Sequence, residues 1–284
     1  MTTDLDPPLV LVVDDDSDTR ELYRMVLESV GYRVEDAANV RAASTVLSRI
    51  VPDAVLTDWL LPDGDGLDVC HALRGRGATR TVPVVAVSGL TFDGEGEARA
   101  RQEGVVTFLE KPTDPDAILG ASRDALLVGT ERRLRAAAER AKRYAEHVSR
   151  HRRLTDRAGC PAEAEALLRR AAARSGDSVA LMIADDSAHY VAASGPTREL
   201  TGYDASELTA LSVWDLTPLA DTVEGHGLWK QFIATGVQQG HYVLRRRDGK
   251  PIEAQYVALA NIAPGWHVSA IAELPALPIT LGAS

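Results

Sequence analysis

The stretch "LVLVVDDDSDTRELY", from Leu9 to Tyr23, joins a short apolar run directly to three consecutive aspartates. The apolar residues Leu9–Val13 form a continuous run, which is typical of a strand that is buried on both faces of a sheet. Ser17 is a residue type that caps helices, and it predicts a helix lasting to about Val30, with Gly31 as its stop. A strand that leads at once into a helix is the repeating unit of a parallel sheet.

The same alternation continues along the first part of the chain. Further strands are expected at Arg33–Ala37, Ala54–Thr57, Val82–Ser88 and Val105–Glu110, and helices at Val40–Ile50, Leu67–Arg74 and Glu95–Glu103. Five strands alternating with helices predict an α/β fold, a five-stranded doubly wound parallel sheet covered on both faces.

Charged and polar side chains follow the ends of these strands. Asp14 and Asp15 end the first strand, Asp58 the third, Ser88 the fourth, and Lys111 comes after the fifth. Carboxyl ends of parallel strands share one rim, so these side chains are expected to meet there. Gathered carboxylates suit a hard cation such as Mg²⁺. A carboxylate beside Mg²⁺ and a lysine can accept a phosphoryl group, because the cations neutralise its charge.

The motifs "VVDDD", "LTDWLLPDGDG", "AVSG" and "FLEKP" together resemble the response-regulator receiver domain of two-component signalling, over about residues 7–128. The resemblance implies that Asp58 is the phospho-acceptor and that a histidine kinase or phosphotransfer protein is the donor. It implies that Asp15 binds Mg²⁺ directly and Asp14 through water, with Asp58 and the backbone carbonyl of Trp59 as the other ligands. Asp16 has no role in that scheme and is expected only to help a helix begin.

The resemblance also implies a switch. Ser88 matches the switch hydroxyl, Lys111 the conserved lysine before a cis Pro112, and Phe108 the aromatic switch position. The two positions that tune the lifetime of the phosphoryl group are Leu60 and Leu90. Neither side chain can orient an attacking water, so we expect phosphorylated Asp58 to decay slowly.

The spacing of the apolar residues predicts a helix that begins at Pro115 and continues for about 40 residues. Leu127, Leu134, Ala141 and Val148 lie seven residues apart, which favours a thin coiled-coil seam and a homodimer. Arginines and lysines crowd residues 132–157. Phosphate binding is one interpretation of that charge. A solvated helix face is the preferred one, so nucleic-acid binding is not expected.

The last part predicts an antiparallel sheet with small helices on one face. "VALMIADDSAHYVAASGPTRELTGYDASELTALSVWDLTP" and "LRRRDGKPIEAQYVA" resemble a PAS domain, over about residues 163–274. That resemblance implies a sensory or dimerising module whose cofactor, if any, is unknown. Six aromatic residues either line a small-molecule pocket or form core: Trp214, Trp229, Phe232, Tyr242, Tyr256 and Trp266.

The expected organisation is a receiver domain at 1–128, a helical linker at 129–160 and a PAS domain at 161–284. The chain has 284 residues and a net charge of −10. Cys70 and Cys160 make neither a disulfide framework nor a zinc site. No apolar stretch is long enough to span a membrane and no signal peptide is recognisable, so a cytoplasmic location is expected.

Three functions remain open from the sequence. The first is a phosphorylation switch that signals through the linker to a PAS domain binding a downstream protein. The second is a ligand-sensing PAS domain that gates a receiver acting as a phosphate sink. The third is nucleic-acid binding by the basic linker. No motif of an output enzyme is present, so no enzymatic activity is expected beyond the receiver's own phosphoryl transfer and dephosphorylation.

Overall fold

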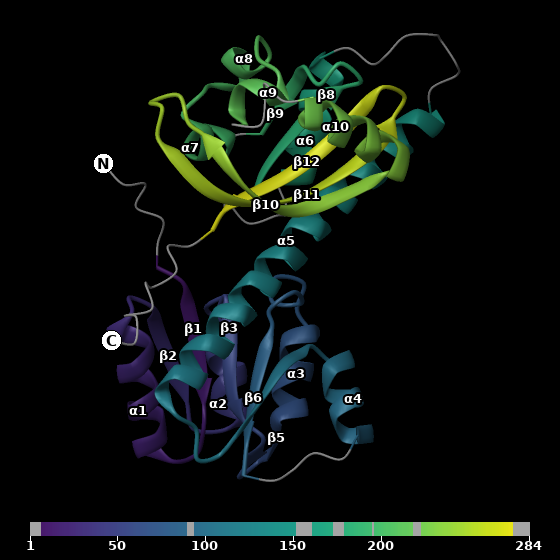
Figure 1. Ribbon diagram of the computed structural model, residues 1–284. Coiled ribbons are helices and arrows are strands. Elements are labelled where there is room, and N and C mark those ends of the chain that lie inside the picture. Colours follow the sequence, from purple (N-terminus) through teal and green to yellow (C-terminus); the bar gives the residue numbers. More distant parts are fainter. Residues whose placement is uncertain are drawn as a thin grey trace. The chain divides into compact units, whose positions relative to one another are not determined.

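The computed structural model (Figure 1) describes residues 7–89, 94–151, 161–172, 179–194, 196–217 and 223–274. The described residues divide into two compact units, one ending at Thr130 and the other comprising Glu131–Leu274. Residues 152–160, which include Cys160 and the end of the expected linker, lie outside the described residues, as does Leu90. No helix in the described ranges is long and apolar enough to cross a membrane.

The first unit is built on a parallel sheet of five strands in the order β2-β1-β3-β6-β7. The strands are β1 (Leu9–Val13), β2 (Arg33–Ala37), β3 (Ala54–Asp58), β6 (Val84–Ser88) and β7 (Val105–Glu110). All five expected strands are confirmed. A two-stranded hairpin, β4 (Leu60–Leu61) and β5 (Gly64–Asp65), follows β3 and was not expected.

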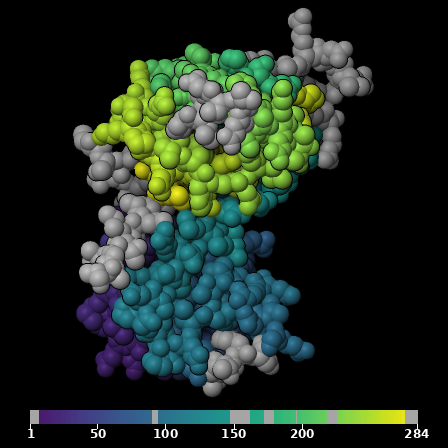
Figure 2. All heavy atoms as spheres, in the orientation of Figure 1, coloured from purple at the N-terminus to yellow at the C-terminus, as the bar shows by residue number. Residues whose placement is uncertain are grey.

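Helices cover both faces of this sheet. They are α1 (Ser17–Ser29), α2 (Val40–Leu47), α3 (Gly66–Arg74), α4 (Gly94–Gln102) and the first part of α5 (Pro115–His151). Side chains alternate along β1, so that Leu11 and Val13 pack with α2 and α3, while Val10 and Val12 pack with α1 and α5. In the space-filling view of Figure 2, teal atoms of α5 form much of the visible surface of this unit.

The start of α1 differs from the expected one by a residue. Asp16, not Ser17, is the N-cap, and its Oδ1 accepts a hydrogen bond from the backbone N–H of Thr19 at 2.8 Å. This bond lowers the pKa of Asp16. Both residue types cap helices, so only the observed backbone geometry distinguishes them. The expectation that Asp16 helps the helix begin is confirmed.

The second unit contains an antiparallel sheet of five strands in the order β10-β11-β12-β8-β9. The strands are β8 (Ala180–Asp185), β9 (Tyr190–Ala193), β10 (Val237–Arg245), β11 (Pro251–Ala263) and β12 (Trp266–Glu273). The expected hairpin at "RDGK" joins β10 to β11, and Gly249 adopts the positive φ of 79° that this turn requires.

Five short or medium helices complete the second unit: α6 (Pro161–Ala172), α7 (Thr197–Thr201), α8 (Ala205–Leu208), α9 (Val213–Leu216) and α10 (Val223–Thr235). The sequence did not predict α6 or α9. Helices α7 to α10 lie on the sheet face lined by Met182 and Leu244. The opposite face is covered by α6 and by the second part of α5, rather than being left open.

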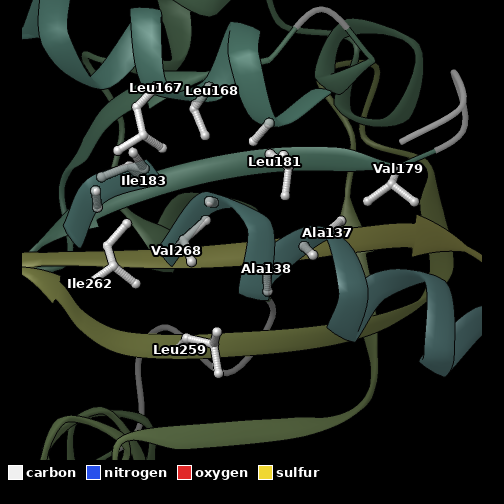
Figure 3. Close-up of a cluster of buried hydrophobic side chains, with 14 of the residues drawn as sticks. Ala137, Ala138, Leu167, Leu168, Val179, Leu181, Ile183, Leu259, Ile262 and Val268 are labelled. Carbon is white, nitrogen blue, oxygen red and sulfur yellow. The ribbon is translucent and has the colours of Figure 1, made fainter. Parts of the chain in front are cut away.

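The apolar stripe of α5 packs on that sheet face, as Figure 3 shows for Ala137 and Ala138 beside Leu181 and Val268. Leu134 and Ala141, two of the four seam positions, are fully buried in this cluster. The side chain of Val148 lies outside the described residues. The sheet of the same chain therefore covers Leu134 and Ala141, two of the residues that were expected to contact a partner helix.

We predict that Ala141→Glu destabilises the second unit, because it places a carboxylate in an apolar interface. The free energy of unfolding should fall by about 3 kcal/mol. Denaturant unfolding followed by tryptophan fluorescence measures this, since three of the four tryptophans lie in this unit.

The matched control is Arg143→Glu on the exposed side of the same helix, which should change stability by no more than about 0.5 kcal/mol. If α5 instead used this stripe in a coiled coil, Ala141→Glu would dissociate a dimer and leave the stability of the monomer unchanged.

Candidate functional site

Three carboxylates converge at the carboxyl ends of β1 and β3. One oxygen from each of Asp14, Asp15 and Asp58 lies within 4.8 Å of the others. The parallel pairing of Val13 with Thr57 brings these residues together, because each is followed directly by a member of the group. The side chains of Asp14 and Asp58 are 1% and 12% exposed, whereas Asp15 is exposed.

Lys111 bridges two members of this group. Its Nζ donates to Asp14 Oδ2 at 2.9 Å and to Asp58 Oδ2 at 2.7 Å. The backbone N–H of Lys111 donates to the Ser88 carbonyl at 2.8 Å, which ties the end of β7 to the end of β6. The Lys111–Pro112 peptide bond is cis, as expected.

Burial and pairing act in opposite directions on the ionisation of these groups. Burial lowers the pKa of Lys111, but its hydrogen bonds to Asp14 and Asp58 and their charges outweigh this and raise that pKa. Burial raises the pKa of Asp14, although the hydrogen bond from Lys111 acts to lower it. The ammonium group is therefore a fixed positive charge in the centre of the site.

The loop after β1 is held by several backbone contacts. Asp14 Oδ1 accepts from the N–H of Asp16 at 2.9 Å, so both oxygens of Asp14 are engaged. Arg20 Nη1 donates to the carbonyl oxygens of Asp14 at 2.7 Å and Asp15 at 3.1 Å. Its Nε donates to Asp36 Oδ2 at 3.0 Å. Sequence reasoning missed Arg20, whose contacts go to the backbone rather than to the acidic side chains.

The donor set fits a divalent cation that prefers oxygen ligands, since three carboxylates meet in one place. Trp59 immediately follows Asp58, and its carbonyl oxygen accepts the N–H of Gly66 at 3.0 Å. A carbonyl has a second lone pair, so this bond leaves it able to act as a ligand. The assignment of Trp59 as a ligand stays a prediction.

The two expected switch residues lie on neighbouring strands. Ser88 is 1% exposed and follows Val87, which pairs with Asp58. Phe108 is half-buried on β7, and its ring lies 6.4 Å from the ring of Trp59. The guanidinium carbon of Arg101 sits 5.1 Å from the centre of the Phe108 ring. A line of contacts thus leads from the residue after Asp58 to the exposed helix α4.

The second unit has a buried polar group that sequence reasoning also missed. His267 is 2% exposed, and its Nδ1 accepts the backbone N–H of Asn261 at 3.1 Å. Its Nε2 lies 3.1 Å from Asp186 Oδ1. Burial lowers the pKa of His267. Trp229 packs edge-on against its ring, with the centroids 5.4 Å apart. The contact of Trp229 with His267 attaches α10 to β12.

Comparison with known proteins agrees with the first unit. Residues 10–123 match the family described as the response regulator receiver domain. The phosphate regulon transcriptional regulatory protein PhoB of Klebsiella pneumoniae is 36% identical over 112 residues, which is 39% of this chain and 48% of PhoB. The chain therefore spans about half the length of that curated relative.

Two further matches cover a similar share of this chain. An uncharacterised 14.6 kDa protein of Leptolyngbya boryana is 35% identical over 106 residues, covering 37% of this chain and 80% of that protein. A crystal structure of a sensor protein from Polaromonas sp. JS666 is 30% identical, covers 43% of this chain and 98% of that one, and has a TM-score of 0.40. Residues 10–123 are a response regulator receiver domain, and through this domain the chain belongs to the response regulator receiver family.

Proposed function

We propose that this chain is a two-component response regulator in which a histidine kinase or phosphotransfer protein phosphorylates Asp58 with the help of Mg²⁺. The observation that carries the proposal is the convergence of Asp14, Asp15 and Asp58 around the ammonium group of Lys111. Together with the receiver match over residues 10–123, this arrangement supports phosphoryl transfer better than a plain acidic surface.

In this proposal a carboxylate oxygen of Asp58 attacks the phosphorus of a phosphohistidine. The new P–O bond forms as the N–P bond breaks, and the imidazole leaves with the electron pair. Lys111 offers a positive charge to the phosphoryl oxygens. Mg²⁺ held by Asp14, Asp15, Asp58 and the Trp59 carbonyl would neutralise further charge. This transfer and the hydrolysis of the resulting aspartyl phosphate, in which water takes the phosphoryl group and Asp58 leaves as the carboxylate, are the only chemistry that we assign to the chain.

The signal would then leave through Ser88 and Phe108. Ser88 would donate its hydroxyl to the new phosphoryl group, and Phe108 would change its packing as the receiver shifts to its active population. The contact of Phe108 with Trp59 and Arg101 supports this route, because it already connects the region of Asp58 to α4.

Helix α5 is the proposed relay to the second unit. Its early residues Ile118 and Leu126 belong to the core of the first unit, and its later residues Leu134 and Ala141 belong to the core of the second. The second unit, which resembles a PAS domain in sequence, would bind a downstream protein. A homodimer would use another face of α5 or the second unit, since the apolar stripe is already covered.

A second candidate is ligand sensing by the second unit. Tyr190, Tyr242 and Tyr256 line one core, where burial raises the pKa of each phenol. The rings of Tyr242 and Tyr256 are 5.1 Å apart. Within the described residues, no hydrogen bond reaches these three hydroxyls. A small polar molecule that entered this core would supply such a partner.

Native mass spectrometry of the purified chain distinguishes the two candidates. A bound small molecule that is lost in Tyr190→Phe favours sensing. A bare chain that still accepts phosphate favours the first proposal. Binding of nucleic acid by the basic part of α5 has no comparable structural support.

We predict that the full chain gains one phosphoryl group when it is incubated with a small phosphodonor and Mg²⁺, and that Asp58→Asn does not. Intact mass measures the gain. Asp16→Asn is the matched control, because asparagine also caps helices and Asp16 lies outside the converging group. The proposal fails if Asp58→Asn still accepts phosphate or if Asp16→Asn abolishes the gain.

We also predict that the phosphoryl group stays on Asp58 for far longer than seconds. Leu60 lies two residues after Asp58, and its side chain is 55% exposed and apolar, so it cannot hold an attacking water in place. Leu60→Gln should shorten the lifetime several-fold, whereas Leu22→Gln on α1 should leave it unchanged. Decay of the phosphorylated mass after removal of the donor measures this, and a wild-type lifetime of seconds would contradict it.

A further inference from the structure

The carboxylate of Asp15 differs from its two neighbours in how it is held. Asp14 and Asp58 are fixed by hydrogen bonds to their side chains from Lys111 and from backbone N–H groups. The Asp15 side chain is exposed, and within the described part of the chain its carboxylate has no hydrogen-bond or ion-pair partner. Its place in the converging group therefore depends on the backbone that carries it.

Arg20 holds that backbone on both sides. Its Nη1 donates to the carbonyl of Asp14 at 2.7 Å and to the carbonyl of Asp15 at 3.1 Å. These carbonyls belong to the two peptide groups that flank the Asp15 Cα atom. One guanidinium group thus restrains the two planes that set the direction of the Asp15 side chain.

The guanidinium is itself fixed in place. Nε of Arg20 donates to Asp36 Oδ2 at 3.0 Å, and the Arg20 side chain is 18% exposed. Asp36 on β2 also pairs with Arg24, one turn further along α1. Arg24 donates to the Val34 carbonyl at 2.9 Å. Within the described ranges, Arg24 contacts no group of the loop that carries Asp14 and Asp15.

We propose that Arg20 is a positioning residue for the cation site of this chain. The guanidinium of Arg20 places a positive charge near the three carboxylates. Because it donates to backbone carbonyls rather than to carboxylates, it leaves the side-chain oxygens of Asp15 open to a cation. It also fixes the loop before the cation arrives, which lowers the ordering cost of binding. The inference rests on the proposed function, because it assumes that the three carboxylates hold Mg²⁺.

The test is a titration of the full chain with Mg²⁺ alone, measured by isothermal calorimetry. Thermal unfolding without the metal is measured on the same variants. Arg20→Met should weaken Mg²⁺ binding by about tenfold, the lower end of what partners of metal ligands contribute. Arg20→Lys should recover part of this loss, because an ammonium can still donate to the two carbonyls. Arg24→Met is the matched control, which shares Asp36 and should leave Mg²⁺ affinity unchanged.

The inference is overturned if Arg20→Met and Arg24→Met weaken Mg²⁺ binding equally, or if Arg20→Met lowers the thermal midpoint with no change in affinity. If Arg20→Met does not fold, Arg20→Lys takes its place. The proposal then requires that Arg20→Lys binds Mg²⁺ more weakly than Arg24→Met, and equal, wild-type affinity in both variants contradicts it. Failure of the proposed function looks different: the wild-type chain binds Mg²⁺ but Asp58 accepts no phosphate. A wild-type chain that binds no Mg²⁺ refutes both.

Discussion

Repulsion among three carboxylates is the constraint on which the first unit depends. Two unit charges about 4 Å apart interact by roughly 4 kcal/mol at the effective dielectric constant of a protein surface. The fold offsets this with the ammonium of Lys111 between Asp14 and Asp58. Lys111 comes from the end of β7, two strands away from β3 and three from β1. Only a long side chain reaches Asp14 from there, so the order of strands and the choice of lysine are linked.

Helix α5 shows how one segment serves two cores. In its first part, Ile118 and Ala125 pack against the parallel sheet. In its second part, a stripe rich in alanine packs against the antiparallel sheet, where small side chains let the helix approach closely. A shift or rotation of this helix would disturb packing in both cores, since interiors are close-packed and do not deform smoothly. That physical property supports the proposal that α5 carries the signal.

The parallel sheet and the converging site residues were predictable because β1, β3 and β6 are short buried apolar runs. Each of them has a polar site residue at its last position or directly after it. Other features depend on information that a single sequence lacks. Apolar residues seven positions apart on a helix can pack against another helix or against a sheet. Leu134 and Ala141 therefore did not indicate that they pack on the antiparallel sheet of the same chain. Helix α6 begins at Pro161, and a proline both begins helices and interrupts them, so the residue type alone did not predict this helix. Arg20 bonds to backbone carbonyls, which leave no trace in side-chain motifs.

The central claim is that Asp58 receives the phosphoryl group, and chemical trapping of the phosphorylated chain tests it most directly. Borohydride reduces an aspartyl phosphate to homoserine, which peptide mass spectrometry then locates. The account predicts homoserine at position 58 alone, formed only when Mg²⁺ is present during phosphorylation. Homoserine at position 14 or 15, or an unreduced phosphate on Ser88, would contradict it.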